Sequence, residues 1–203
     1  MQPQFEVMGM FPVPLYLGKL DDISPDELRF IDETEYEGET VDGNRISRDR
    51  RILEHPRMAQ VKAQVIGHLD IYRQTVLNTD NELYITQSWT NKNGKGTQHQ
   101  AHYHANSVIS GTLYFSPDEG VPPIVFKSDR KTAIQVQYKQ QNAYTADTFS
   151  FKPRTSMLIL FPSSIEHFVP VNNATSTRIS LAFNTFVRGH LGEEKNLTAL
   201  RVD

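Results

Sequence analysis

Hydrophobic residues change their spacing near residue 80 of the chain. Before that point, apolar side chains recur every three or four residues, at Met58, Val61, Val65, Leu69, Tyr72 and Val76. This spacing predicts an amphipathic helix that packs one face against a flat partner. After residue 81 the apolar runs are short and rich in β-branched and aromatic residues, and Gly, Pro, Asn and Asp separate them. Such runs predict β-strands.

Seven segments carry the strand pattern: residues 82–90, 107–115, 122–128, 148–153, 156–162, 167–171 and 178–186. Strands at this density behind a helix predict a mainly β fold with supporting helices, either a sandwich or a jelly roll. The sequence shows no internal repeat and no low-complexity linker, so we expect a single domain over 1–203. Within it we assign an N-terminal edge strand and helical support to 1–81, the core to 82–188 and a C-terminal tail to 189–203.

Two shorter elements and a loop precede the long helix. Residues 11–20 alternate apolar positions between two prolines, which predicts a strand at the edge of a sheet. Ser24 and Glu27, with a proline between them, form a capping-box pattern that predicts a short helix. Residues 35–47 hold two glycines and many acids, which predicts a loop. Its acidic part, Glu35–Asn44, is either a plain surface loop or a lid over a site.

The composition of the chain excludes several classes of site and argues against several kinds of partner. The 203 residues include 21 Lys and Arg against 24 Asp and Glu, a net charge of -3 without a long run of either sign, so we expect no nucleic-acid partner. The sequence holds no cysteine, which excludes disulfides, thiolate metal sites and cysteine nucleophiles. Neither a signal-peptide pattern nor a long apolar stretch appears, so we expect a soluble intracellular protein without a membrane partner.

Histidines carry the first chemical signal. His102 and His104 lie two residues apart, and residues two apart on an extended strand point to the same face. Both can then ligate one metal ion, and His167, at a distant strand, is the natural third ligand. Three ligands on one face of an octahedron leave other positions open for substrate and oxygen, as non-haem iron sites require. The alternative is a polar strand that carries these histidines by chance.

Arg178 is the second signal, because it lies on a small, polar strand face together with Ser180. A planar guanidinium suits bidentate capture of a carboxylate, and the neighbouring hydroxyl can add one hydrogen bond to the same group. The alternative is a structural salt bridge. On the strand 107–115, Thr112 and Tyr114 share a face whose hydroxyls we expect to line the cavity.

These residues, in this order, resemble the Fe(II)/2-oxoglutarate-dependent oxygenase superfamily, and more narrowly a branch of it found in marine bacteria and their phages. The matching pieces are FPVPLY, SWTN, HYHANSVISGTLYF, LILFPSSIEHFVPV, RISLAFN and GHLGEEKNLTAL, which span nearly the whole chain. The resemblance implies a double-stranded β-helix, which is a form of jelly roll. It also implies a dioxygenase, in the simplest case a hydroxylase, that couples oxidative decarboxylation of 2-oxoglutarate to succinate with oxidation of a substrate.

The resemblance also assigns roles to the candidate residues. It implies that His102 and His167 bind Fe(II) and that His104 takes the position usually held by Asp or Glu. It implies that Arg178 and Ser180 hold the distal carboxylate of 2-oxoglutarate. It further implies that Tyr114 and Thr112, on the facing strand, contact 2-oxoglutarate. We expect a cytoplasmic enzyme, in the host cytoplasm if a phage encodes it, acting on an unidentified small molecule or peptide. The oligomeric state stays open, a homodimer included.

His104 is the point where the chain departs from the superfamily pattern. Three neutral imidazoles give the metal one negative charge fewer than two imidazoles and a carboxylate, so its oxidised states are less stabilised. The third ligand could instead be His99, Asn106 or a distant acid such as Asp118 or Glu119. We rank His104 first because the two-residue step aligns it with His102 on an extended strand, whereas the three-residue step from His99 does not.

Two other classes of function compete. A cupin-like three-histidine enzyme would not use 2-oxoglutarate, but the glutamate expected shortly after the His-x-His pair is absent, and Arg178 would have no role. A non-catalytic jelly roll would bind or assemble without a metal. The single tryptophan, Trp89, is expected in the core rather than at a substrate, and Asn91 can face the cavity.

Overall fold

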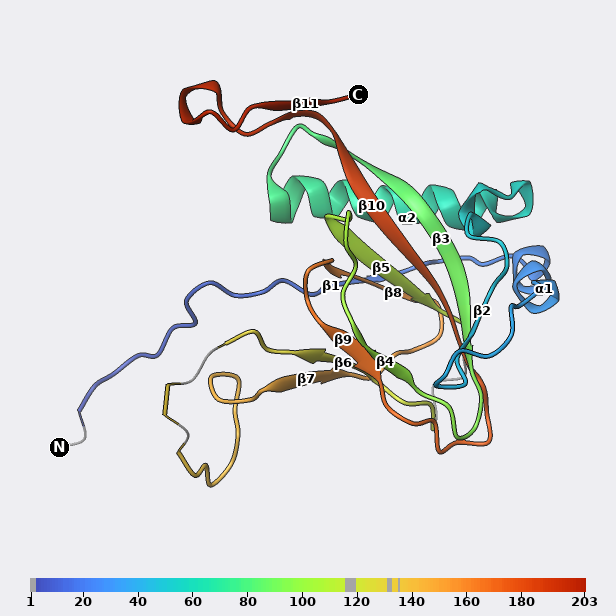
Figure 1. Ribbon diagram of the computed structural model, residues 1–203, viewed down its shortest axis with the longest axis horizontal. Helices are drawn as coiled ribbons and strands as arrows, with labels where there is room; N and C mark the ends of the chain where they lie inside the picture. Colours follow the sequence, from blue (N-terminus) through green and yellow to red (C-terminus); the bar gives the residue numbers. More distant parts are fainter. Residues whose placement is uncertain (1–2, 116–119, 131–132, 135) are drawn as a thin grey trace.

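The computed structural model describes residues 3–115, 120–130, 133–134 and 136–203 (Figure 1). Two antiparallel sheets face each other, and a long helix lies on the outer side of the larger sheet (Figure 1). The large sheet has the strand order β1-β8-β5-β10-β3-β2, with β11 paired to β10, and the small sheet has the order β4-β9-β6-β7. This confirms the predicted fold class, a mainly β jelly roll with supporting helices.

The strands of the large sheet are β1 (Tyr16–Lys19), β2 (Arg45–Ile46), β3 (Glu82–Asn93), β5 (Ile109–Tyr114), β8 (Met157–Pro162), β10 (Arg178–Leu191) and β11 (Leu200–Val202). Those of the small sheet are β4 (His99–His102), β6 (Ile124–Lys127), β7 (Thr148–Phe151) and β9 (His167–Val169). The α-helices are α1 (Pro25–Glu33) and α2 (Ala59–Tyr72), and the short helical turns are η1 (Ile52–Glu54), η2 (Pro56–Met58), η3 (Arg73–Leu77) and η4 (Glu194–Asn196).

Helix α2 confirms the predicted apolar stripe over most of its length. The side chains from Met58 to Tyr72 in that stripe are at most 1% exposed. They pack against the outward residues of β5, β8 and β10 in one core cluster. Val76 is an exception, since it is 38% exposed. Residues 73–77 form a π-helical turn, and the change in period rotates Val76 away from the sheet.

The N-terminal elements form as their local sequence predicts. Helix α1 begins at Ser24, whose side chain accepts a hydrogen bond from the Glu27 N–H, while the Glu27 side chain accepts from the Ser24 N–H. This reciprocal capping box satisfies two donors at the helix start. Strand β1 pairs only with β8, which confirms an edge strand.

All seven predicted strands are present, and three further strands carry no readable pattern in the sequence. These strands, β2, β4 and β11, have two to four residues each. Elements this short have no hydrophobic period of their own and form because a neighbouring strand offers a pairing edge. Strand β10 also extends beyond the predicted end at residue 186, and residues 189–191 pair with β11.

The predicted loop at 35–47 is irregular but anchored. Tyr36 and Ser47 form a β-bridge, and the side chain of Asn44 is fully buried. The Asn44 amide donates to Asn91 Oδ1 at 3.2 Å and its oxygen accepts from Asn93 Nδ2 at 2.9 Å. The loop is therefore tied to β3 beside the cavity, and its role as a lid stays a prediction.

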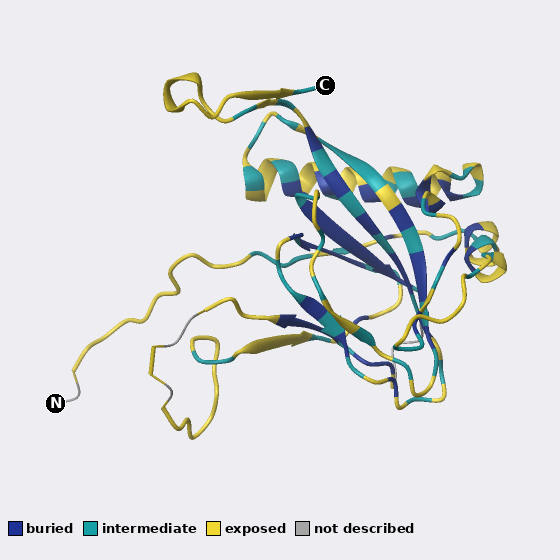
Figure 2. Ribbon diagram, viewed as in Figure 1, coloured by how far each residue is buried: buried dark blue, intermediate teal, exposed yellow. Residues whose placement is uncertain are grey.

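The buried residues differ in character between the outer and the inner face of the large sheet (Figure 2). The outer face of the large sheet contributes to the apolar cluster with α2. Its inner face is apolar only towards the β6 side, where Tyr114, Phe126, Ile159 and Phe161 pack together.

Among the described residues, none of the helices has the length and apolar character that a membrane span requires. The division into 1–81, 82–188 and 189–203 stays a prediction.

Candidate metal centre

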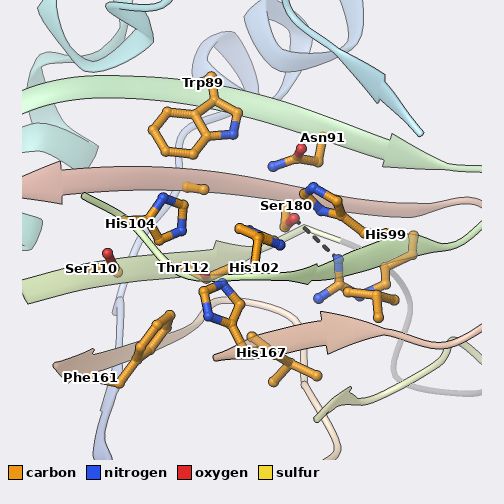
Figure 3. A pocket seen from close by; sticks show the side chains of 15 residues that line it. Trp89, Asn91, His99, His102, His104, Ser110, Thr112, Phe161, His167 and Ser180 are labelled. Carbon is orange, nitrogen blue, oxygen red and sulfur yellow. Dashed lines mark hydrogen bonds between the residues drawn. The ribbon is translucent and has the colours of Figure 1, made fainter. Parts of the chain in front are cut away.

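A pocket opens between the two sheets, on the polar part of the inner face of the large sheet (Figure 3). Strands β3, β5 and β10 form one wall, and the ends of β4 and β9 face them. Including its open mouth, the pocket holds about 440 Å³ of space. The charged or metal-ligating side chains that line it are His99, His102, His104, His167 and Arg178.

Three imidazoles converge in this pocket. His102 and His167 are directly paired across β4 and β9. One ligand nitrogen from each of His102, His104 and His167 lies within 4.8 Å of the others. Figure 3 shows the three rings side by side at the centre of the pocket. Among the described residues, this is the one group of three or more potential ligands that could hold a metal ion.

The backbone around His104 differs from the extended strand that the sequence predicts. Strand β4 ends at His102, and the N–H of His104 donates instead to the carbonyl oxygen of Ser163 at 3.0 Å. The contact to the turn after β8 directs the ring back into the pocket, where it lies 5.1 Å from the His102 ring and 5.2 Å from the His167 ring. The two histidines do meet in the pocket, although His104 lies beyond the end of β4.

Backbone carbonyls orient two of the three imidazoles. The Nδ1 atom of His102 lies 2.7 Å from the carbonyl oxygen of Gln100, and that of His167 lies 3.0 Å from the carbonyl oxygen of Ile165. A carbonyl only accepts, so each Nδ1 carries the proton and each Nε2 keeps its lone pair. Hydrogen bonding of the second ring nitrogen is the usual way in which proteins orient a metal-ligating histidine.

His104 and His167 are neutral at physiological pH. Burial, and secondly the neighbouring His102, lowers the pKa of His104 to about 4. The same two causes, in the same order, lower the pKa of His167 to about 3. A neutral imidazole can donate its lone pair to a metal, whereas a protonated one cannot. The donor set therefore fits a borderline metal such as Fe(II).

His99 enters the pocket although its spacing argued against this. Its ring stacks on that of His102 with a centroid distance of 4.4 Å. A register irregularity between His99 and His102 in the β4–β9 pairing allows this, because a bulge re-aims side chains that alternation would separate. Burial and then the charge on neighbouring His102 lower the pKa of His99 to about 4. His99 lies outside the group of three ligand nitrogens.

Neither Asn106 nor a described acid provides a third ligand in the pocket. Asn106 is exposed, lies in a left-handed conformation with φ of 55°, and lines a separate groove. Asp118 and Glu119 lie outside the described residues. No aspartate or glutamate of the described chain lines the pocket.

Arg178 is buried at the inner end of the pocket without a carboxylate partner among the described residues. It is 2% exposed. Its Nη1 atom has only long contacts, to Ser180 Oγ at 3.3 Å and Asn93 Oδ1 at 3.5 Å, and its Nε atom has no partner. Burial lowers the pKa of the guanidinium from its ordinary value, although it stays charged. The described residues therefore form no structural salt bridge with Arg178.

The predicted cosubstrate contacts gather around Arg178. Its guanidinium carbon lies 5.0 Å from the centre of the Tyr114 ring, and the buried Tyr114 hydroxyl has no hydrogen-bond partner. Thr112 and Ser180 line the same pocket. Residues on β5 and β10 meet because Ser180 pairs with Tyr114 in the sheet. Their roles in binding 2-oxoglutarate stay predictions.

Trp89 was expected in the core, and this is wrong. Its ring lines the pocket, with its centre 5.7 Å from that of His104. Trp89 lies on the inner face of β3, where Ser88 and Thr90 take the outward positions. Asn91, two residues further on, also lines the pocket. The alternation around Trp89 was visible in the sequence, but which face would carry a site was not.

A second groove, which the sequence does not predict, lies beyond His104. Including its open mouth, it holds about 770 Å³ of space, and its lining side chains are Tyr84, Thr86, Gln87, Ala105, Asn106, Asn184 and Phe186. Strands β3 and β10 have 12 and 14 residues, whereas β4 and β9 have four and three. The long strands therefore run past the small sheet and leave their inner face uncovered. A bulge at Asn184/Thr185 lies in this uncovered part.

Residues 87–184 match the model of a family described as "Putative 2OG-Fe(II) oxygenase". This stretch runs from β3 to β10 and contains the three clustered histidines and Arg178. No curated protein sequence matches the chain significantly.

Solved structures show the same fold. A 2OG-Fe(II) oxygenase family oxidoreductase from Burkholderia pseudomallei has 16% identity and a TM-score of 0.57, over 79% of this chain and 78% of that chain. A prolyl-4-hydroxylase from Pseudomonas putida has 18% identity and a TM-score of 0.56, over 87% and 94%. HygX from Streptomyces hygroscopicus, solved with nickel, 2-oxoglutarate and hygromycin B, has 10% identity and a TM-score of 0.59, over 85% and 82%.

These comparisons agree with the donor set. Residues 87–184 are similar to the putative 2OG-Fe(II) oxygenase family, and the solved oxygenase structures share the fold of this chain. Three converging imidazoles fit a metal ion, and a buried guanidinium without a carboxylate partner among the described residues fits a carboxylate ligand. The narrower resemblance to a branch in marine bacteria and phages stays a prediction.

Proposed function

We propose that the protein is a 2-oxoglutarate/Fe(II) oxygenase, and more narrowly a hydroxylase, in which His102, His104 and His167 hold the metal and Arg178 anchors the cosubstrate. Bound Fe(II) would supply the oxidation chemistry that couples decarboxylation of 2-oxoglutarate to succinate with hydroxylation of a substrate C–H bond. The chain itself binds, orients and excludes water. The metal site and the anchor lie in one pocket, so one small diacid can reach both.

The observation that carries the proposal is the charge of Arg178. A buried guanidinium without an acidic partner is costly, because desolvation is not offset by pairing. Among the described residues its polar contacts are an amide and a hydroxyl at 3.3 Å or more. A carboxylate from a ligand would pair with this charge and would satisfy the orphaned Nε atom as well.

Three more groups support a dianionic ligand at this end of the pocket. The Tyr114 hydroxyl is buried without a partner and can donate to a carboxylate oxygen. Ser180 and Thr112 add hydroxyls from β10 and β5. A cupin-like enzyme that does not use 2-oxoglutarate would leave all these donors and the charge of Arg178 without a function.

We assign the substrate to the groove beyond His104. Its rings, Tyr84 and Phe186, are directly paired across β3 and β10 and form an apolar platform. Apart from Ala105, its other side chains carry a hydroxyl or an amide, and the described lining holds no charged group. Arg188 lies over the Tyr84 ring at 4.1 Å, but pairs with Glu82 at 3.3 Å. This lining suits an uncharged, ring-bearing group with hydrogen-bonding substituents.

The first test separates cosubstrate binding from metal binding. We expect Arg178→Met to weaken the affinity for 2-oxoglutarate by about 10- to 150-fold, because it removes a charge-assisted pair of about 1.5–3 kcal/mol. Iron affinity should stay unchanged. Calorimetric titration of 2-oxoglutarate into anaerobic, Fe(II)-loaded protein measures the first, and titration of Fe(II) into the metal-free protein measures the second. The control is Arg29→Met, since Arg29 is an exposed arginine of α1. An iron-loaded wild type that neither binds 2-oxoglutarate nor releases succinate would contradict the proposal.

The substrate assignment has its own test. Replacement of Tyr84 and Phe186 by alanine should raise KM for an accepted substrate and leave 2-oxoglutarate affinity unchanged, because both rings lie outside the pocket that holds Arg178. Substrates are screened as pairs that differ only in a carboxamide or a carboxylate, and succinate release is measured. Preference for the carboxylate member would contradict an uncharged groove.

A further inference from the structure

A row of hydrogen-bonded side chains leads from His104 into the protein, and neither metal nor cosubstrate binding accounts for it. Asn184 Nδ2 lies 3.4 Å from His104 Nδ1, and the Ser110 hydroxyl donates to Asn184 Oδ1 at 2.9 Å. Ser110 Oγ lies 2.9 Å from Ser163 Oγ, which lies 2.7 Å from Ser107 Oγ. Asn184 is thus the member of the row that touches a proposed ligand.

The far end of the row is fixed by backbone groups. The Ser107 hydroxyl has carbonyl acceptors on Ile109 and Thr185, at 3.2 and 3.1 Å, and accepts from the Thr185 N–H at 3.3 Å. Ser110 and Ser163 are buried. Because the row ends on rigid strands, it can hold the Asn184 carboxamide at a constant distance from His104.

The orientation of that carboxamide decides which nitrogen of His104 is protonated. In a neutral imidazole one nitrogen carries the proton and the other carries a lone pair. With its nitrogen towards His104, as in this structure, Asn184 donates to Nδ1, so the proton is on Nε2. With its oxygen towards His104, Asn184 would accept from an Nδ1 proton and leave the Nε2 lone pair free.

Only the second arrangement matches the other two ligands. His102 and His167 have their Nδ1 protons directed at carbonyl oxygens, which leaves Nε2 for a metal. At His104 the amide of Asn184 occupies the position that a carbonyl oxygen takes at the other two rings. The serine row tolerates both amide orientations, because a hydroxyl both donates and accepts and Ser110 can reverse its role.

We propose that Asn184 is a positioning residue that sets the tautomer of His104, and that its carboxamide turns its oxygen to Nδ1 when a metal binds. The inference rests on the proposed function, in which His104 is the third ligand. Total protonation does not change: the Nε2 proton leaves to water, and a proton from water binds Nδ1. Such partners behind a ligand contribute about 10- to 100-fold to metal affinity in other proteins.

The tautomer can be read directly from ¹⁵N chemical shifts of the histidine rings, with Zn²⁺ as a diamagnetic probe. In metal-free wild type we expect the Nε2 proton on His104, and in Zn²⁺-loaded wild type the Nδ1 proton. Asn184→Asp offers only acceptor oxygens, so His104 should carry the Nδ1 proton even without metal. Asn184→Ala should weaken Zn²⁺ affinity by about 10- to 100-fold. The control is Gln87→Ala, the exposed amide paired with Asn184 across β3 and β10, which should change neither readout.

Each outcome decides for or against the inference. It is overturned if metal-free wild type already carries the Nδ1 proton, if Asn184→Asp has the same tautomer as metal-free wild type, or if Asn184→Ala binds Zn²⁺ like the wild type. The wild-type comparison needs no variant, so a variant that fails to fold leaves the test intact. If wild type binds no Zn²⁺ at all, both this inference and the proposed metal site fail. Zn²⁺ binding that does not depend on Asn184 overturns the inference alone.

Discussion

The two faces of β10 contrast in polarity and in what covers them. On the outer face, Leu181 and Phe183 are fully buried in the cluster with α2. On the inner face, Arg178 and Ser180 line the pocket and Asn184 lines the groove. One strand therefore serves two environments because its side chains alternate in direction. The outer face holds the sheet to its helix, and the inner face presents chemistry.

The same contrast appears in energetics. Burial of apolar side chains on the outer face stabilises the fold, at about 25 cal/mol per Å² removed from water. The inner face instead buries a charge without a partner and a hydroxyl without a hydrogen bond, at Arg178 and Tyr114. Groups of this kind oppose folding until a ligand satisfies them. A stable outer face is what allows the inner face to be unfavourable on its own.

The largest expected effect comes from the outer face. Phe183→Ala should lower the free energy of unfolding by about 3–5 kcal/mol, since it leaves a cavity under α2. Urea unfolding followed by circular dichroism measures the change. Phe149→Ala is the control, because that ring is 59% exposed on β7, and it should change stability by no more than about 0.5 kcal/mol. Equal losses in both variants would refute the contrast.

Gly111 sharpens the comparison from the neighbouring strand. A Cβ atom at Gly111 would lie 2.1 Å from Cζ of Phe183, its partner across β5 and β10. Gly111→Ala should therefore cost about 1–3 kcal/mol by overpacking. Combined with Phe183→Leu, the loss should be smaller than the sum of the single losses. Gly67→Ala, on an open face of α2, should instead stabilise by about 1 kcal/mol. Additive losses at Gly111 and Phe183 would show that they do not compete for space.

On the inner face a substitution should have the opposite sign. Arg178→Met removes an unpaired buried charge and keeps most of the side-chain volume, so the ligand-free protein should gain about 1 kcal/mol or more in unfolding free energy. In the presence of metal, added 2-oxoglutarate should stabilise the wild type more than the variant. A loss of stability in the ligand-free variant would mean that Arg178 is paired inside the protein.

Acid should weaken the metal-free protein through its buried histidines. The pKa values are about 4 for His99 and His104 and about 3 for His167, against 6.5 in the unfolded chain. The unfolded state binds more protons below pH 6.5, so the stability from these neutral rings is complete above that pH. It falls as pH drops from 6.5 towards 4, and for His167 towards 3. Denaturation midpoints measured across pH 3 to 7, with His167→Gln for comparison, check this. If the denaturation midpoint of His167→Gln changed with pH as steeply as that of the wild type, the assignment of a lowered pKa to His167 would be contradicted.

Local sequence determined much of the fold. The stripe of α2, the capping box of α1 and the pattern of the seven predicted strands depend on residues close in the chain, so they are readable without a structure. The alternation of side chains along this strand also predicted that Arg178 and Ser180 lie on the opposite face from Leu181 and Phe183. The sequence did not reveal β2, β4 and β11, whose few residues pair only because a neighbouring strand is already in place.

Tertiary structure decided the details of the site. His104 reaches the pocket through a hydrogen bond to Ser163, and His99 through an irregular register, and both depend on residues distant in the chain. Trp89 and the groove along β3 and β10 became visible only once the lengths of facing strands could be compared. The sequence by itself named the residue types that can bind a metal and a carboxylate. Their convergence needed the fold, because alternation fixes on which face a side chain lies but not which distant strand will cover that face.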